Sequence, residues 1–273
     1  MSKRNSQSAK TAARERLRQE RERQAKRDKA RRQVIVAASV VAVLAAAGGI
    51  GYAVVQANKP TGWDAVKDQK LVKPANTTGA DGTTVVIGKS TAKKTLSMYE
   101  DPRCPVCAQF EQSVGSTLRK GVTDGKFKFQ YVGATFIDNN IPGTGSKNAL
   151  SALGAALNVS PEAFLEYKSA LYSAQYHPDE QDDKFKDDAY LLKVADTVSA
   201  LKGNTKFQND VKNGTFDKWA LVMNDKFDAD GQKYKFSGTP TLMMDGKVLT
   251  TDGKNPPMSV ADFNRVVDAA LKG

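Results

Sequence analysis

The residues best suited to chemistry are Cys104 and Cys107, in the run Cys104-Pro105-Val106-Cys107. Proline fits the first position of a helix, where no N–H is needed, so the run predicts a helix that starts at Pro105 with Cys104 at its N-terminus. Unpaired N–H groups and the positive end of the helix dipole favour a thiolate there, and Arg103 adds a nearby positive charge. The spacing therefore predicts a nucleophilic Cys104 and, one turn on, a shielded Cys107 that resolves mixed disulfides.

Redox chemistry is favoured over a structural role for this pair. A thiolate preference stabilises the reduced dithiol and makes the disulfide more oxidising. The alternative is an inert bridge or two core thiols, but so short a loop removes little chain entropy. The chain has two cysteines and one histidine, fewer than the four ligands of a structural zinc site. We therefore expect no metal and no cofactor.

A second feature lies far downstream, at Thr239-Pro240, just before an apolar run that begins at Leu242. Proline is tolerated at the start of a strand. A cis bond between Thr239 and Pro240 would expose the backbone of Thr239 beside the cysteines. The motif is weak alone, and it gains meaning only together with the Cys-Pro-Val-Cys run.

The surrounding hydrophobic patterns predict the elements that position these residues. Alternating apolar residues and turn signals predict strands over 83–88, 95–100, 126–132, 239–246 and 247–250. Helical periodicity predicts helices from Pro105 to about Gly121 and over 148–157, 161–173, 187–202, 206–213, 216–227 and 260–271. This order predicts an α/β domain over 83–273, interrupted by a helical insertion over about 144–230.

The N-terminal part has a different composition. The chain carries 41 Lys and Arg against 30 Asp and Glu, and residues 1–33 alone hold 13 of the former and four of the latter. The remainder is near neutral, which argues against a basic surface that binds nucleic acid. We expect residues 1–33 to be a cytoplasmic tail that acts as a topology signal.

An uncharged run, Val34–Val55, follows this tail and is long enough to cross a bilayer. Because positive flanks stay in the cytoplasm, we expect a single transmembrane helix that leaves the following domain outside the cell membrane. Two alternatives stay open: a cleaved signal peptide, with Ala45-x-Ala47 as its site, and a buried helix. Residues 56–82 contain prolines and turn residues, which predicts a linker with one short helix over 63–69.

The order of strand, Cys-Pro-Val-Cys, helix, helical insertion, Gly-Thr-Pro-Thr, strands and helix resembles the DsbA family of thioredoxin-fold thiol–disulfide oxidoreductases. It is most similar to the membrane-anchored, extracytoplasmic members of Gram-positive bacteria, through Tyr99-Glu100-Asp101, Leu171-Tyr172 and Ser237–Leu242. The resemblance implies that Cys104 attacks, that Cys107 resolves, and that Thr239-Pro240 is a cis-proline loop that binds the substrate chain. It also implies exported protein thiols as substrates and a membrane reoxidase of the DsbB or VKOR type.

Two departures from the family pattern bear on the chemistry. Strongly oxidising members often carry histidine at the third motif position, which is Val106 here, so we expect a less extreme thiol pKa. Many thioredoxin-fold enzymes carry a buried acid where this chain has Met98. Glu100 or Asp101 are possible proton carriers instead, although either could simply be solvated or cap the helix.

The function we expect is donation of disulfides to exported proteins. An isomerase or a reductase would use the same residues. Two further classes stay open: a tethered binding or folding module without redox chemistry, and a metal-carrying protein. We also expect His177 to be exposed, the acidic run 179–188 to be a solvated face, and residues 136–141 to line either the core or an apolar groove.

Overall fold

The computed structural model describes residues 62–273, which form one compact unit. The predicted tail, the predicted transmembrane helix and residues 56–61 lie outside the described residues. Within 62–273, no helix combines the length and apolar character that crossing a bilayer requires.

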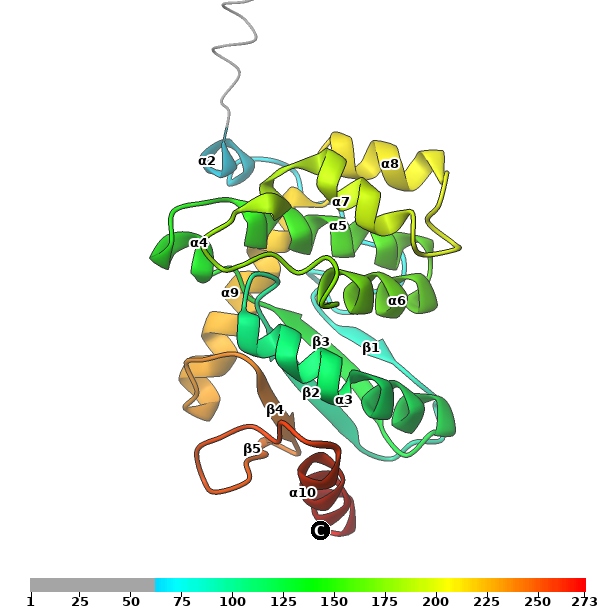
Figure 1. The fold of residues 1–273 in the computed structure, drawn as a ribbon, viewed down its shortest axis with the longest axis vertical. Helices are drawn as coiled ribbons and strands as arrows, with labels where there is room; N and C mark the ends of the chain where they lie inside the picture. Colours follow the sequence, from blue (N-terminus) through cyan, green and yellow to red (C-terminus); the bar gives the residue numbers. More distant parts are fainter. Residues whose placement is uncertain (1–61) are drawn as a thin grey trace, which may run out of the picture. The chain divides into compact units, whose positions relative to one another are not determined.

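A five-stranded sheet with the order β1-β3-β2-β4-β5 forms the centre of this unit (Figure 1). Strands β2 and β3 are parallel, and the other neighbours are antiparallel. The parallel register aligns Glu100 with Gly133, so both strands end at the same edge of the sheet. The strands are β1 (Val85–Ile87), β2 (Thr95–Glu100), β3 (Lys128–Gly133), β4 (Thr241–Met244) and β5 (Lys247–Val248).

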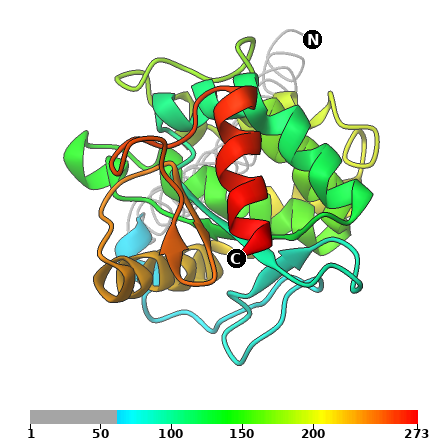
Figure 2. The ribbon, with the colours of Figure 1, turned by 90° about the horizontal axis from the view of Figure 1, so that it is seen from below.

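Helices cover both faces of the sheet and form a separate group beside it. Figure 2 shows α10 next to α3, where Phe263 packs edge-on against Phe110. On the opposite face, Phe227 of α9 packs against Tyr99 of β2. The helices are α2 (Trp63–Val66), α3 (Pro105–Asp124), α4 (Ile137–Asn140), α5 (Gly145–Val159), α6 (Pro161–Leu171), α7 (Asp188–Ala195), α8 (Thr205–Lys212), α9 (Asp217–Tyr234) and α10 (Val260–Lys272), with a 3-10 turn, η1 (Lys184–Lys186).

The predicted α/β order agrees with this architecture, and α4 to α9 form the insertion between β3 and β4. Two helix ends differ from the prediction by seven residues, and the other helix boundaries differ by three or fewer. Helix α9 runs seven residues past Phe227, because its last turns are mostly polar and carry no apolar period. Helix α7 ends at Ala195, and the Thr197 hydroxyl then bonds to the Val194 carbonyl.

Residues 62–82 were predicted to be a linker, but they pack on the domain instead. The Trp63 indole N–H donates to Asn148 Oδ1 at 3.0 Å, and Asn76 donates to the Leu157 carbonyl at 2.8 Å. The buried Trp219 indole donates to the Gly82 carbonyl at 2.8 Å. These partners lie far away in sequence, so a local reading of composition could not find them.

Candidate active site

Cys104 lies where β2 ends and α3 begins, as predicted from Pro105. It is the N-cap of α3, and Pro105 occupies the first turn. The Cys107 backbone N–H points at Cys104 Sγ, at a distance of 3.4 Å. Cys104 is 6% exposed, whereas Val106, two residues later, is 40% exposed.

The surroundings of Cys104 stabilise its thiolate. Hydrogen bonding from the Cys107 thiol is the main cause that lowers the pKa of Cys104, to about 6, with smaller contributions from Thr239 and the Cys107 and Val106 backbone N–H groups. Burial opposes this shift and is outweighed. The value agrees with the expectation of a lowered but not extreme thiol pKa.

Cys107 has the opposite environment. It is completely buried, and this burial raises its pKa well above the ordinary thiol value. The hydrogen bond to Cys104 and the charge of that thiolate raise it further. At neutral pH the pair therefore presents one thiolate, at Cys104, and one protonated thiol, at Cys107.

The Thr239–Pro240 loop lies directly against the first cysteine. The Thr239–Pro240 peptide bond is cis, and the Cys104 thiol points at the Thr239 carbonyl oxygen at 3.5 Å. Two segments far apart in the sequence, at Cys104 and at Thr239, thus form one surface. Thr239 is half-buried in this surface.

Glu100 and Asp101 are both buried rather than solvated. Glu100 forms an ion pair with Lys168 of α6 at 2.9 Å, and burial raises its pKa to about 7. Its second oxygen, Oε1, has no hydrogen-bond partner within residues 62–273. The charge of Cys104 raises the pKa of Glu100 slightly further, so the two groups lie within electrostatic reach of each other.

Asp101 has a positioning role. Its carboxylate accepts the Arg103 N–H at 3.0 Å, the Ile137 N–H at 3.1 Å and the Ser146 hydroxyl. Burial raises the pKa of Asp101 to about 7 against the effect of these bonds. Because all its described contacts are structural, Asp101 joins the start of the motif to α4 and α5, and Glu100 is the better candidate for proton transfer.

Arg103 does not supply a free positive charge beside Cys104, contrary to the sequence-based interpretation. Its side chain is buried and turns away to pair with Asp138 at 2.9 Å, while Asp183 lies at 3.5 Å. It also donates to the Glu180 carbonyl at 2.9 Å. Part of the acidic run is therefore a partner of the motif rather than a solvated face.

His177 is half-buried, not exposed as predicted. Its ring stacks on Tyr172 and lies 3.1 Å from the Pro102 carbonyl through Nε2. Burial lowers its pKa. The run from His177 to Asp183 thus closes over the residues that precede Cys104.

Sequence reasoning missed Lys168 and Glu111. Lys168 Nζ lies 2.7 Å from Glu111 Oε2 of α3, so one buried lysine of the insertion pairs with carboxylates before and after the cysteines. The signal was available in the helical pattern, because Lys168 stands on the apolar stripe formed by Phe164, Tyr167 and Leu171. A lysine in such a stripe requires a buried partner.

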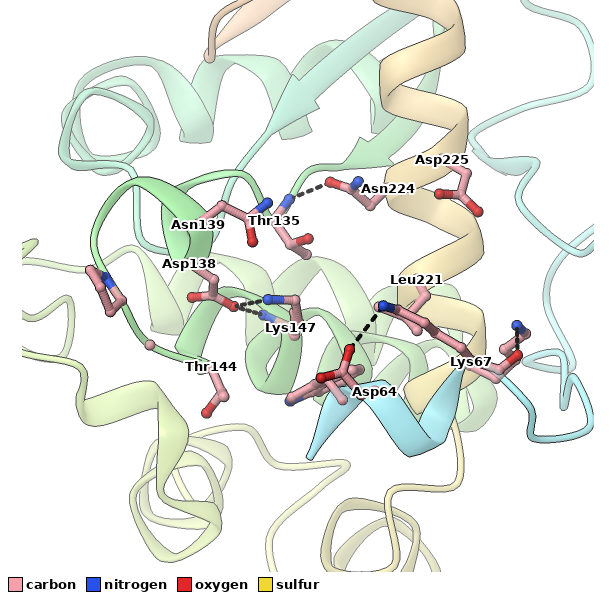
Figure 3. Close-up of a pocket in the computed structure, with 14 residues that line it drawn as sticks. Asp64, Lys67, Thr135, Asp138, Asn139, Thr144, Lys147, Leu221, Asn224 and Asp225 are labelled. Carbon is pink, nitrogen blue, oxygen red and sulfur yellow. Dashed lines mark hydrogen bonds and ion pairs between the residues drawn. The ribbon is translucent and has the colours of Figure 1, made fainter. Parts of the chain in front are cut away.

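Residues 136–141 contribute to the site through one face of α4. Ile137 belongs to the same buried cluster as the two cysteines, and Phe136 and Ile141 pack against it. The other face of α4 borders a cavity of about 760 Å³ that neither cysteine lines (Figure 3). Asp138 and Asn139 form part of its wall together with residues of α2, α5 and α9.

A dithiol at the start of a helix beside a cis-proline, on a central sheet of this topology, defines a thioredoxin-type site. A family model described as thioredoxin matches residues 80–269, and the chain belongs to this family.

Curated relatives cover different shares of the chain. This chain is 30% identical over 121 residues to the serine/threonine-protein kinase PknE of Mycobacterium tuberculosis. The matched region spans 42% of this chain and only 21% of the kinase. This chain is 26% identical over 193 residues to disulfide bond formation protein D of Bacillus subtilis, across 69% of this chain and 77% of that protein.

Solved structures agree on the fold. Oxidised DsbA of Mycobacterium tuberculosis matches with a TM-score of 0.53 and 24% identity, over 69% of this chain and 98% of that one. Oxidised BdbD of Bacillus subtilis matches with a TM-score of 0.55 and 21% identity, over 74% of this chain and 100% of that one. MdbA of Actinomyces oris, a thiol-disulfide oxidoreductase, matches with a TM-score of 0.56 and 19% identity, over 68% of this chain and 88% of that one.

Proposed function

We propose that this protein is a thiol–disulfide oxidoreductase that donates disulfides to exported proteins through Cys104 and Cys107. The observation that carries the proposal is the contrast between the two thiols at one helix start. Cys104 has a pKa of about 6 and lies 3.5 Å from the Thr239 carbonyl oxygen, whereas Cys107 is completely buried and holds its proton. A lowered pKa makes Cys104 a good leaving group and makes the disulfide oxidising.

The reaction proceeds in two exchanges. A substrate thiolate attacks Cys104 of the oxidised pair, forms a mixed disulfide and releases Cys107, which takes up a proton. A second thiolate of the same substrate then attacks the substrate sulfur of the mixed disulfide, which releases Cys104 as a thiolate. The substrate gains a disulfide and the enzyme becomes a dithiol. Glu100, which has a pKa of about 7 and lies within electrostatic reach of Cys107, is the proposed source of the Cys107 proton.

The reduction potential tests the direction of this exchange. An oxidase requires a value well above that of thioredoxin, which is about −270 mV. We expect equilibration of the Cys104–Cys107 pair with glutathione to give such a value. A potential near that of thioredoxin would instead favour a reductase, which uses the same residues. An isomerase would have a potential between that of a reductase and that of an oxidase.

Two cysteine variants separate catalysis from simple chain binding. Cys104→Ser should abolish oxidation of a model dithiol peptide, and Cys107→Ala should accumulate mixed disulfides through Cys104. The two variants lose one sulfur each, so each controls for the other. Retained activity of the Cys104→Ser protein in cells would support a tethered binding module and overturn the redox assignment.

The proposal includes a membrane location. The uncharged run Val34–Val55 and the basic residues before it support a single-pass anchor with a cytoplasmic N-terminus and an extracytoplasmic catalytic domain. Exported protein thiols would then be its substrates, and a membrane reoxidase of the DsbB or VKOR type would restore the disulfide. Protease treatment of intact cells should remove the C-terminal domain and leave a protected N-terminal fragment. A shed, shortened protein would replace the anchor with a cleaved signal peptide.

A further inference from the structure

The cavity beside α4 has no role in the disulfide exchange described above. It measures about 760 Å³, within the size range of ligand sites in proteins, and residues of α2, α4, α5 and α9 line it (Figure 3). Most of the side chains that line it are charged or carry an amide, whereas small-molecule sites are mostly apolar. Such a cavity suits a ligand that brings charged groups of its own.

The cavity and the redox pair lie at the same edge of the sheet. Strands β2 and β3 are parallel and end together; Cys104 follows β2, and Thr135, which lines the cavity, follows β3. Ligand sites in α/β sheets lie outside the carboxyl ends of the parallel strands. Helix α4 contributes to both places, because Ile137 packs in the cluster of the two cysteines and Asn139 lines the cavity.

The cis-proline loop lies on the other side of Cys104 along this edge. Strand β4 is the neighbour of β2 on the side away from β3, and its first residue, Thr241, pairs with Tyr99. Thr239, Cys104 and α4 therefore follow one another in the order of the strands β4, β2 and β3. A substrate chain that lies along this edge, with its sulfur at Cys104, would extend over α4 toward the cavity.

Most charges around the cavity are already compensated within the domain. Asp64 pairs with Lys67 at 2.8 Å. Asp138 pairs with Arg103 at 2.9 Å, and Lys147 lies 3.5 Å from the same carboxylate. These groups shape the wall and leave little charge for a ligand.

Lys218 and Asp225 are the charged groups of the wall that form no ion pair among residues 62–273. Both belong to α9, seven residues apart, which corresponds to about 10 Å along the helix axis. Asn224 accepts the Thr135 N–H at 2.8 Å, so its neighbour Asp225 lies at the end near the sheet. The Lys218 ammonium donates to the Lys67 carbonyl beside α2. The wall thus presents an anion near the sheet and a cation farther from it.

We propose that this cavity is a second subsite for the substrate polypeptide, which places a basic side chain against Asp225 and an acidic one against Lys218. The inference rests on the proposed function, because it extends the chain that reacts at Cys104. A helix is about 10 Å wide, and an extended chain covers that distance with about three residues. The basic residue therefore lies about three to five positions from the substrate cysteine, and the acidic residue about three positions beyond it.

Two dithiol peptides of identical composition test this order of charges. Each carries one lysine and one glutamate, at about four and about seven positions from the nearer cysteine; the lysine is nearer in the first peptide and the glutamate in the second. The oxidised full chain should oxidise the first peptide with a second-order rate constant about threefold to tenfold larger. In about 1 M salt the two rate constants should converge, because salt screens the charges.

The position of the charges in the peptide provides a further comparison. Peptide pairs that carry the charges before the cysteines and pairs that carry them after the cysteines are both measured. The preference should appear in one of these two arrangements, because the cavity lies on one side of Cys104 and Thr239 lies on the other.

Exchange of the two wall charges should reverse the preference. In the double variant Lys218→Glu with Asp225→Lys, the peptide with the nearer glutamate should react faster. A loss of stability does not reverse a preference, so this readout separates binding from a structural effect. Lys218→Gln and Asp225→Asn should each lower the preference without reversing it. Lys193→Gln is the matched control: Lys193 is an exposed cation of α7 outside the cavity wall, and its removal should leave the preference as it is in the wild type.

Three results would overturn the subsite: equal rate constants for all peptides in the wild type, a double variant that keeps the wild-type preference, and an equal effect of Lys193→Gln. Should the double variant fail to fold, the two neutral variants supply the measurement, and an unaltered preference in both would also overturn the subsite. A wild type that oxidises none of the peptides would refute the proposed function itself, whereas oxidation of all of them at one rate would refute the subsite alone.

Discussion

Cys104 and Cys107 carry the same side chain, yet their surroundings move their pKa values in opposite directions. Cys104 accepts hydrogen bonds at a helix start and has a pKa of about 6. Cys107, one turn later, is enclosed by the core, and burial raises its pKa. The difference fixes the order of events, because at neutral pH only the sulfur at position 104 is ionised.

The potential of the pair should depend on pH with a change of slope near pH 6. Below that value, reduction takes up two protons with two electrons, and the potential falls by about 60 mV per pH unit. Above it, the reduced form keeps Cys104 as a thiolate, one proton is taken up, and the fall is about 30 mV per unit. Equilibration with glutathione from pH 4.5 to 8 measures both slopes. A single slope across this range would contradict the lowered pKa of Cys104.

Val106 provides a second test at the residue scale. Its side chain is 40% exposed and follows Cys104 by two positions. Val106→His should place a protonated imidazole near the thiolate, lower the pKa of Cys104 by about one unit and raise the potential by up to about 30 mV. Thiolate absorbance measures the pKa. Val106→Asn controls for polarity without charge and should leave the pKa nearly unchanged.

At the scale of elements, buried charges fasten α3 and the segment before it to the insertion. Arg103 holds α4 through Asp138, while Lys168 of α6 joins Glu100 to Glu111. Buried pairs contribute less to stability than their attraction suggests, but removing one partner leaves a charge without compensation. These pairs therefore fix the position of the insertion relative to the cysteines.

Arg103→Met should reduce the free energy of unfolding by about 3 kcal/mol, because Asp138 loses its closest cation within the core. Denaturant unfolding measures the loss, and Arg103→Met with Asp138→Asn should recover part of it. Lys120→Met is the control. Lys120 pairs with Asp124 on the surface of α3, and such pairs contribute less than about 1 kcal/mol. Equal losses in the two single variants would contradict the role of Arg103.

Local patterns were enough to predict most elements and the cysteine site. Cys104 and Pro105 mark the start of α3, and alternating apolar residues mark β3. What a local pattern cannot contain is the partner of a buried charge. Arg103 was interpreted as a nearby positive charge, although Asp138 and Asp183 neutralise it. Lys168 stands out on its apolar stripe, but its partners Glu100 and Glu111 follow from the packing of α6 on α3, which no short window of sequence encodes.

At the scale of the whole molecule, the domain begins at Gly62 and not at residue 83. The segment 62–82 shields Trp219 and gives its indole N–H a partner in Gly82. Composition favoured a linker here, since prolines and turn residues do not reveal that a segment packs against distant helices.

A shortened protein that starts at residue 83 should be less stable than one that starts at Gly62. Removal of 62–82 leaves the Trp219 N–H without its acceptor and exposes the surface under Val66, for a loss on the order of 2–4 kcal/mol. Thermal and denaturant unfolding of the two proteins measure the difference. Equal stability would mean that the segment adds nothing to the domain.

The ion pair between Glu100 and Lys168 also restricts how this protein can diverge. A related protein that lost the helical insertion would keep a buried carboxylate at position 100 with no cation to balance its charge. Replacement of the lysine alone would have the same effect. Among related chains, an acid at the position of Glu100 should thus be inherited together with a base at the position of Lys168, and both should disappear together.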